Sequence, residues 1–336
     1  MLFLLGAGFN IDAAGIAKDL GILEHDPVCN YPLVSDTLKI CFGAGNIPPG
    51  KSVEVLFAEA IAANSDEPMD RLSNFLMKAD GYIARRLAHS EKPNCYRGFF
   101  EAFQDCQFLT FNYDSLVETF LFQMGRWFPH DGFGVNADVQ RPWDFKGPPG
   151  TAISTLTVLH LHGSLCVYAT EFEITADRQL VQRERPYFTF DPSEMSGKFT
   201  SYERKVGWGY RHPHERVIAP VPSKAEGLTE VFIKEVYAKA EGLVCSSGNL
   251  VAIGYSFNEH DRESWVRILS ALSASSHPKL LLVSPESESV AERLRPAFPR
   301  IEIGSAKQTL KKWIDGAFRG SAGMVPEALA KSRITR

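Results

Sequence analysis

The chain has 336 residues, of which 44% are hydrophobic and 23% are charged. This balance is typical of a soluble globular protein with one large domain or two, and it excludes a chain that is disordered throughout. The net charge of −4 excludes an overall positive field, and apolar runs such as residues 2–5 are far shorter than the roughly 20 residues that cross a bilayer, so we expect a cytoplasmic protein that binds neither nucleic acid nor membrane.

The predicted strands are short apolar runs, rich in β-branched or aromatic residues, that end in polar or glycine-containing loops. They are residues 2–5, 107–111, 156–161, 216–219, 250–254 and 280–283. Helical periodicity lies between and beside them, at residues 53–63, 71–88, 96–104, 114–124, 228–241 and 287–294. The alternation predicts an α/β fold with a doubly wound, parallel, Rossmann-like sheet, whose ligand binds where the carboxyl ends of the strands meet.

Three stretches fit this alternation poorly. A helical stretch at about 30–92 is expected to pack as an insertion over the crevice, and an aromatic, Pro- and Gly-rich stretch covers about 125–150. An irregular insertion at about 169–214 interleaves charges with the aromatic residues between 187 and 210, as either a lid, a partner surface or a small local core would. We therefore predict one domain, residues 1–320, followed by a tail at 321–336.

The first predicted strand runs directly into Gly6, Ala7, Gly8, Phe9 and Asn10. Glycines at a strand-to-helix turn let a diphosphate approach the bare backbone, so these five residues are predicted to bind a dinucleotide. An ordinary dinucleotide fingerprint needs a third glycine where this chain has Ile11, which argues against a dehydrogenase.

Asn112 and Asp114 follow the predicted strand at 107–111, and their side chains are expected to emerge at the same edge of the sheet. This position suits groups that contact a ligand. Asp114 also has a simple structural explanation, because an aspartate there can cap the helix that begins near Ser115.

His160 and His162 alternate along the next predicted strand and therefore point to the same face. His160 lies deeper in the strand and is expected to be structural. His162 ends the strand beside Gly163, where an imidazole can reach a ligand hydroxyl and titrate near neutral pH. We predict that His162 is catalytic.

Two later strands end in a similar way. Gly254 and Ser256 close the strand at 250–254, where a hydroxyl and nearby amides can hold a phosphate or a ribose. Ser284 follows the strand at 280–283 and is predicted to bind the adenosine end of the same ligand. For each of these positions an ordinary turn is the alternative explanation.

The motifs stand in a recognisable order along the chain: Gly6-Ala7-Gly8, Asn112-x-Asp114, His162-Gly163 and Gly254-x-Ser256. This order, over about residues 1–315, resembles the NAD site of the sirtuin superfamily. It is similar to the zinc-less bacterial sirtuin-like NADases of anti-phage defence, such as Thoeris effectors and the sirtuin-like partners of HerA-type ATPases and short Argonautes. Residues 217–220 with Lys224, and Asp261 after residues 254–257, add to the similarity.

The resemblance implies that NAD is the substrate, that no metal is needed, and that three residues are catalytic. The residue aligned with Asn112 positions the ribose and a water near the scissile bond, and that aligned with Asp114 orients the nicotinamide carboxamide. The histidine aligned with His162 acts as a base on a ribose hydroxyl. These roles suit a reaction in which an oxocarbenium-like sugar forms and neutral nicotinamide leaves.

The six cysteines include no C-x-x-C pair, whereas deacylating sirtuins carry a zinc module with two such pairs. We therefore expect no zinc module in this chain. The segment with which those enzymes pair an acyl-lysine substrate also lacks a counterpart near residues 165–170, which favours water as the acceptor.

On these grounds we predict an NAD glycohydrolase that releases nicotinamide and ADP-ribose and depletes NAD in an infected cell. Two alternatives stay open: an NAD-dependent protein deacylase or ADP-ribosyltransferase, and a non-catalytic module that senses NAD or ADP-ribose. Because an unrestrained NADase would poison its own cell, we expect control by homo-oligomerisation, by an occluding segment or by a separate regulatory protein such as a HerA-type ATPase.

Overall fold

The computed structural model describes residues 1–23, 30–43, 51–63, 65, 67–129, 131–135, 138–140, 154–164, 167–169, 172–174, 180–182, 187–190 and 231–319. Within these ranges no helix is both long and apolar enough to cross a membrane. The predicted strand at 216–219, the predicted tail at 321–336 and much of the predicted insertion at 169–214 lie outside the described residues.

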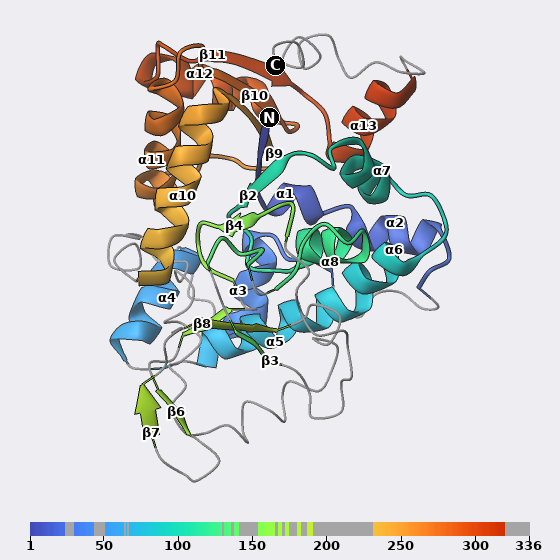
Figure 1. Cartoon of the computed structure of the whole chain (residues 1–336), viewed down its shortest axis with the longest axis vertical. Helices are drawn as coiled ribbons and strands as arrows, with labels where there is room; N and C mark the ends of the chain where they lie inside the picture. Colours follow the sequence, from blue (N-terminus) through green and yellow to red (C-terminus); the bar gives the residue numbers. More distant parts are fainter. Residues whose placement is uncertain are drawn as a thin grey trace.

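A six-stranded parallel sheet forms the centre of the fold, in the order β11-β10-β9-β1-β2-β4 (Figure 1). Its strands are β1 (Leu2–Leu5), β2 (Gln107–Thr110), β4 (Val158–His160), β9 (Asn249–Ile253), β10 (Lys279–Val283) and β11 (Glu302–Ala306). Every residue of β1 is buried, as expected for a central strand covered on both faces. The predicted α/β fold with a doubly wound, parallel, Rossmann-like sheet is confirmed.

The strand order reverses between β1 and β9. From β1 the chain adds β2 and then β4 on one side of the sheet, and it later returns to add β9, β10 and β11 on the other side. In an open parallel sheet, the loops that follow two such strands leave in opposite directions and open a crevice at the carboxyl ends. The topology therefore places a binding crevice after β1 and β9.

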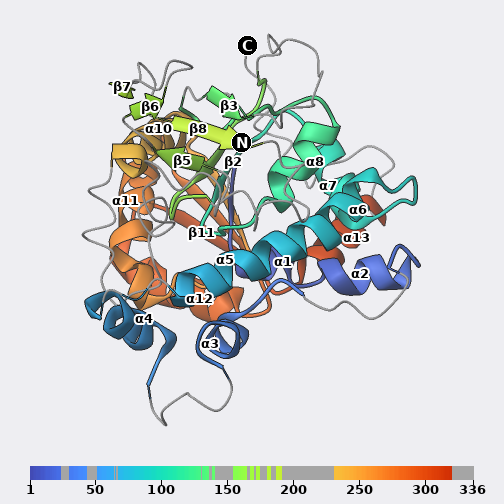
Figure 2. The same ribbon diagram turned by 90° about the horizontal axis from the view of Figure 1, so that it is seen from below.

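Helices cover both faces of this sheet (Figures 1 and 2). On one side lie α10 (Val231–Ser247), α11 (Arg262–Ser273) and α12 (Ser287–Ala297), and on the other lie α7 (Cys95–Ala102) and α13 (Leu310–Arg319). The ring of Phe3 in β1 contacts that of Phe99 in α7, with centroids 5.1 Å apart, and that of Phe108 in β2, at 5.6 Å. Aromatic packing thus joins the sheet to the helices on this face.

The helical insertion predicted at about 30–92 is helical where the structure describes it, and Figure 1 shows it beyond the carboxyl ends of the strands. After α1 (Ala7–Asn10) and α2 (Ala13–Asp19), it contains α3 (Val34–Phe42), α4 (Val53–Ala62), α5 (Glu67–Ala79), η1 (Asp80–Ala84) and α6 (Arg85–His89). The single helix predicted at 71–88 is interrupted by η1, a π-helical turn. Asp80 begins this turn and accepts a hydrogen bond from Tyr31, so the interruption coincides with a tertiary contact.

Several elements differ from the prediction. β11 and the helices α11 and α13 were not predicted, and the sequence of β11, EIGSA, is not an apolar run because this strand lies at the sheet edge and is half exposed. Short strands occupy the described parts of the predicted irregular stretches: β3 (Asp138–Gln140), β5 (Val167–Ala169), β6 (Phe172–Ile174), β7 (Leu180–Gln182) and β8 (Tyr187–Phe190). They form one three-stranded and one two-stranded sheet.

Candidate active site

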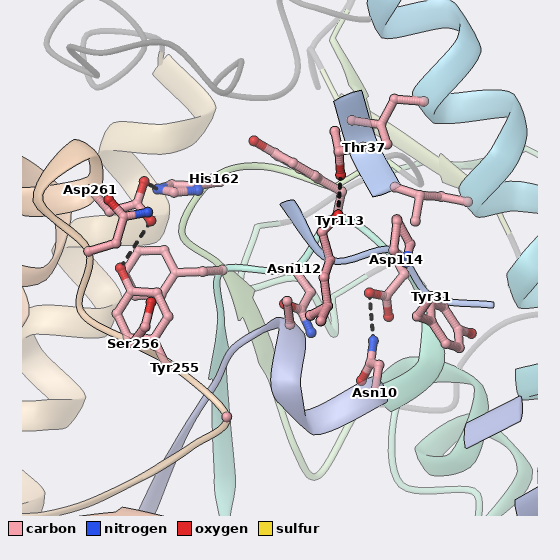
Figure 3. A pocket seen from close by; sticks show the side chains of 18 of the residues that line it. Asn10, Tyr31, Thr37, Asn112, Tyr113, Asp114, His162, Tyr255, Ser256 and Asp261 are labelled. Carbon is pink, nitrogen blue, oxygen red and sulfur yellow. Dashed lines mark hydrogen bonds and ion pairs between the residues drawn. The ribbon is translucent and has the colours of Figure 1, made fainter. Parts of the chain in front are cut away.

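A cavity of about 210 Å³ lies at the crevice between β1 and β9 and is also lined by the helical insertion (Figure 3). The loops that follow the strands contribute Ala7, Asn10, Phe111, Asn112, Tyr113, Asp114, His162, Gly254, Tyr255, Ser256, Asn258 and Asp261. The insertion contributes Tyr31, Pro32, Leu33, Thr37, Val53, Glu54, Leu72 and Leu76. Asn112, Asp114 and His162 therefore line one cavity, while their catalytic roles stay predictions.

The loops after β1 and β9 touch through three glycines. The amide of Gly6 donates a hydrogen bond to the carbonyl oxygen of Ile253 at 3.0 Å, and that of Gly8 donates to the carbonyl oxygen of Gly254 at 2.9 Å. A Cβ added to Gly8 would lie 2.9 Å from the Cα of Gly254, which itself has φ of +63°. These glycines are thus needed for close backbone contact, and the amides of Gly6 and Gly8 are used within the protein.

Three other residues predicted to bind the dinucleotide occupy different environments. Phe9 is buried and packs against Tyr96, with ring centroids 5.5 Å apart, so its side chain belongs to the aromatic core. Ser256 is exposed and lines the cavity. Ser284 follows β10, where its amide donates to the carbonyl oxygen of Ala306 at 3.3 Å, and it is not one of the described residues that line the cavity.

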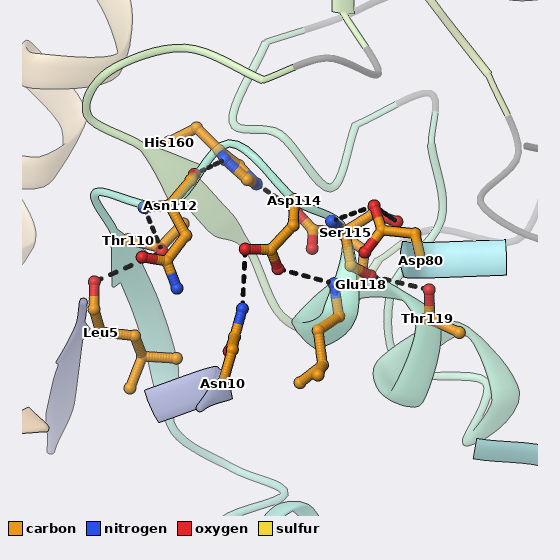
Figure 4. A network of polar contacts seen from close by, with 11 residues as sticks. Leu5, Asn10, Asp80, Thr110, Asn112, Asp114, Ser115, Glu118, Thr119 and His160 are labelled. Atoms are coloured by element: carbon orange, nitrogen blue, oxygen red, sulfur yellow. Dashed lines mark hydrogen bonds and ion pairs between the residues drawn. The ribbon is translucent and has the colours of Figure 1, made fainter. Parts of the chain in front are cut away.

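Asn112 is half-buried immediately after β2 and is held by three contacts, of which Figure 4 shows those with Thr110 and His160. Its side-chain Nδ2 donates to the carbonyl oxygen of Gly6 at 3.2 Å, and its backbone amide donates to Oγ1 of Thr110 at 3.0 Å. Its carbonyl oxygen accepts from Nδ1 of His160 at 2.9 Å. The three contacts come from the turn after β1, from β2 and from β4, and they fix the residue at the cavity wall.

Asp114 is buried and uses both carboxylate oxygens. Oδ2 accepts a hydrogen bond from Nδ2 of Asn10 at 2.7 Å, and Oδ1 accepts from the amide of Leu116 at 3.2 Å, at the start of α8 (Leu116–Gln123). Burial raises the pKa of Asp114 to about 6, the nearby Glu118 carboxylate adds to the rise, and the hydrogen bond from Leu116 opposes it. Asp114 thus supports the helix start while it lines the cavity.

His160 is buried behind the loop that carries Asn112. Its Nε2 pairs with the carboxylate of Glu118, which is also fully buried. Burial lowers the pKa of His160, but the charge of Glu118 and its hydrogen bond more than offset that effect, so the net shift is upward. The structure gives His160 the surroundings of a structural residue.

His162 lies two residues after the end of β4, with its side chain 5% exposed. Its ring packs edge-on against Phe111, with centroids 4.7 Å apart and an interplanar angle of 64°. Its Nε2 lies 3.7 Å from Oδ1 of Asp261, at the end of the 3-10 turn η5 (Glu259–Asp261) that precedes α11. The cavity thus brings together side chains that follow β1, β2, β4 and β9.

A second buried carboxylate, that of Asp80, ties the helical insertion to the loop after β2 (Figure 4). Oδ1 accepts from the hydroxyl of Tyr31 at 2.7 Å, and Oδ2 accepts from the amide and the hydroxyl of Ser115 at 2.8 and 3.0 Å. Burial is the main cause that raises the pKa of Asp80, and the charge of Asp114 contributes. The insertion and the candidate catalytic loop therefore share one polar network.

Sequence reasoning did not find Tyr31, Glu54, Asp80 or Glu118. Each lies in a helix, in a turn or just before a helix, where its type is unremarkable. Contacts across the fold bring Tyr31 and Glu54 to the cavity, and they bring Asp80 and Glu118 to Ser115 and His160 behind it. Asp261 was noted for the family similarity but was not assigned to the site.

The described residues contain no group of three or more His, Cys, Asp or Glu side chains that could hold a metal ion. Cys41, Cys95 and Cys245 are free thiols and Cys106 is buried, whereas Cys29 and Cys166 lie outside the described residues.

Comparison with known proteins identifies one family. No curated protein matches the chain. The family model described as the SIR2-like domain matches residues 107–302, more than half of the chain, a range that includes Asn112, Asp114 and His162. Domains of this family bind NAD and are typically NAD-dependent enzymes. The chain belongs to the SIR2-like domain family.

Proposed function

We propose that the protein is an NAD glycohydrolase that cleaves the bond between nicotinamide and ribose and releases nicotinamide and ADP-ribose. The observation that carries this proposal is the convergence of Asn112, Asp114 and His162 on one cavity, from the ends of β2 and β4. The three residue types match those that the sirtuin resemblance implies for cleavage of NAD.

Asn10 and Asp114 support a subsite for the nicotinamide carboxamide. Asn10 is 1% exposed, and its Oδ1 has no hydrogen-bond partner among the described residues although it is a strong acceptor. A primary carboxamide has two N–H donors, which Oδ1 of Asn10 and the carboxylate of Asp114 can accept. The carboxylates of Glu54 and Asp261 also line the cavity and favour the positive charge of the oxidised nicotinamide ring.

Asn112 and His162 are the residues that we assign to the ribose. The Asn112 amide can position a hydroxyl or a water near the reacting carbon, and the His162 imidazole can accept a proton from a ribose hydroxyl. When the glycosidic bond breaks, its electron pair leaves with the nicotinamide nitrogen, and the oxygen of water bonds to the sugar carbon. The overall reaction consumes one water and releases one proton.

The test is to incubate the purified full chain with NAD and to measure nicotinamide and ADP-ribose by chromatography, with and without an acetylated peptide. We expect both products without peptide. Nicotinamide that appears only with peptide would favour the deacylase or transferase alternative, and binding of NAD without any product would favour the sensing module. Either result would overturn the proposal.

Two variants test whether Asn112 and His162 are catalytic. Asn112→Ala and His162→Ala should each reduce nicotinamide release at least 100-fold, because each removes a group that contacts the reacting sugar. His277→Ala is the matched control, since His277 is exposed and bonds only to its neighbour Ser276 among the described contacts. Activity that persists in either site variant would contradict the assignment.

We further propose that the enzyme depletes NAD during phage infection and that a homo-oligomer or a separate regulatory protein, such as a HerA-type ATPase, restrains it in the cytoplasm until then. The toxicity of unrestrained NAD cleavage supports this restraint. Cells that express the chain with its genomic neighbours should keep their NAD until phage is added, and cells with His162→Ala should keep it throughout. Unchanged NAD levels in infected cells with the wild-type protein would oppose the defence role.

A further inference from the structure

The two carboxylate oxygens of Asp261 contact two different residues that line the cavity (Figure 3). Its Oδ1 lies 3.7 Å from Nε2 of His162, and its Oδ2 accepts a hydrogen bond from the hydroxyl of Tyr255 at 3.3 Å. The side chains of His162 and Asp261 are only 5% and 15% exposed. A pair this shielded is screened less by salt than a surface ion pair.

Aromatic packing holds Asp261 and His162 close to each other. The ring of Tyr255 stacks on that of Phe111, with centroids 4.3 Å apart and an interplanar angle of 14°. The ring of His162 meets the same Phe111 ring edge-on at 4.7 Å. Phe111 therefore lies between the residue that anchors Asp261 and the imidazole that Asp261 approaches, and it couples the end of β2 to the loops after β4 and β9.

Two other titratable residues that line the cavity, Tyr113 and Glu54, give His162 no closer carboxylate in the part of the chain that the structure describes. Tyr113, from the loop after β2, is a neutral neighbour at 6.3 Å between ring centroids. The carboxylate of Glu54, on α4, lies 3.8 Å from Nε2 of a different histidine, His260. Asp261 at 3.7 Å is thus the nearest anionic partner that the described contacts give to His162.

We propose that Asp261 is a positioning residue for His162: its carboxylate orients the imidazole and stabilises the imidazolium that forms when His162 accepts a proton. Within the proposed function, that proton comes from a ribose hydroxyl, whose oxygen keeps the electron pair of the broken O–H bond, so this role rests on the proposed function. A carboxylate at this distance favours the charged imidazole, and contacts between catalytic groups commonly tighten when substrate binds. Tyr255 holds the second carboxylate oxygen and so limits rotation of Asp261.

The direct test follows the protonation of His162 by NMR in the full chain, with the His162 signal identified by its loss in His162→Gln. Asp261→Asn keeps the shape of the side chain and removes its charge, so the midpoint of the His162 titration should move to lower pH by about one unit. Asp261→Glu keeps the charge and should restore most of that shift. The matched control is Glu259→Gln, because Glu259 lies in the same turn but pairs with Arg262 at the surface.

Tyr255→Phe provides a second, independent variant. It keeps the ring that stacks on Phe111 and removes only the hydroxyl that donates to Asp261. Without that anchor the Asp261 carboxylate can rotate away from the imidazole, so the His162 midpoint should fall, by less than in Asp261→Asn. An unchanged midpoint in this variant, or equal shifts in Asp261→Asn and Glu259→Gln, would overturn the inference.

Kinetics separate this inference from the proposed function. In Asp261→Asn, kcat for nicotinamide release should fall about 10- to 100-fold with a smaller change in KM, and the acidic limb of the pH profile should move with the His162 midpoint. If no variant and no wild-type sample releases nicotinamide, the proposed function fails, while the titration still decides whether Asp261 controls His162. If turnover is normal and the His162 midpoint does not depend on Asp261, only the inference fails.

Discussion

The side chains of Asn10 and Asp114 are 104 residues apart in the sequence, yet Nδ2 of Asn10 donates to Oδ2 of Asp114 at 2.7 Å inside the protein. The bond joins α1, which follows β1, to the loop that follows β2. It exists because β1 and β2 are parallel neighbours, so that their carboxyl ends emerge side by side. The two residues form the floor of the nicotinamide subsite that we propose.

Asn10→Ala should destabilise the protein, because it leaves a buried carboxylate without one of its donors. We expect the free energy of unfolding to fall by about 1.5 to 3 kcal/mol, as measured by urea denaturation at pH 7.5. Asn30→Ala is a suitable control, since Asn30 is exposed and its side chain bonds to backbone atoms, the amide of Tyr31 at 2.8 Å and the carbonyl oxygen of Ile11 at 3.5 Å, rather than to a buried carboxylate. Equal effects of the two substitutions would show that the Asn10 contact adds nothing.

Because the pKa of Asp114 is raised to about 6, the free energy of unfolding should depend on pH in a defined direction. The folded protein holds the Asp114 proton more tightly than the unfolded chain, so this contribution is fully present below pH 4 and is lost as pH rises through about 6. The variant Asp114→Asn has no carboxylate at this position, so its unfolding free energy should not show this decrease with pH. The wild type should therefore lose about 2 to 3 kcal/mol of unfolding free energy relative to the variant between pH 4 and pH 7, measured by denaturation across that range. A constant difference would contradict the shift.

Removing one partner of the buried pair of His160 and Glu118 should lower the unfolding free energy more than replacing both partners. Replacing His160 by Phe leaves the Glu118 carboxylate buried without its partner, and the unfolding free energy should fall by about 3 to 5 kcal/mol. The double variant His160→Phe, Glu118→Leu should recover more than half of that loss. Chemical denaturation of the two single variants and the double variant measures the coupling, and strictly additive losses would argue against an ion pair.

Gly254→Ala should disrupt the site more than a typical glycine substitution. The residue has φ of +63°, and an added Cβ would lie 2.3 Å from the backbone carbon of Gly8, so the loops after β1 and β9 would have to separate. We expect a loss of about 2 kcal/mol or more in unfolding free energy, together with weaker NAD binding by calorimetry.

Gly15→Ala is the control for that experiment. Gly15 lies in the interior of α2, and nothing lies within 4 Å of a Cβ added there. This substitution should leave stability unchanged or raise it by up to about 1 kcal/mol, because alanine favours a helix more than glycine does. A Gly254→Ala variant as stable as Gly15→Ala would contradict the close contact of the loops.

Much of the fold could be predicted because the central strands are buried on both faces. Such strands need apolar residues at successive positions, and the runs that became β1, β2, β9 and β10 are visible for that reason. β11 was not predicted, since an edge strand needs no such run. Similarly, the helix predicted at 71–88 contains a π-helical turn that begins at Asp80, and the bonds of Asp80 to Tyr31 and Ser115 are tertiary contacts that no local pattern shows.

By itself, the sequence determined the alternation of strands and helices and placed Asn112, Asp114 and His162 directly after strands, because both features depend on short-range periodicity. Only the tertiary structure decided which polar residues share a cavity and how they are paired. The contacts of His162 with Asp261 and of Ser115 with Asp80 depend on strand order and on burial, and no local pattern encodes either. The tertiary structure also decided the pKa of Asp114, because burial removes the carboxylate from water and thereby raises its pKa.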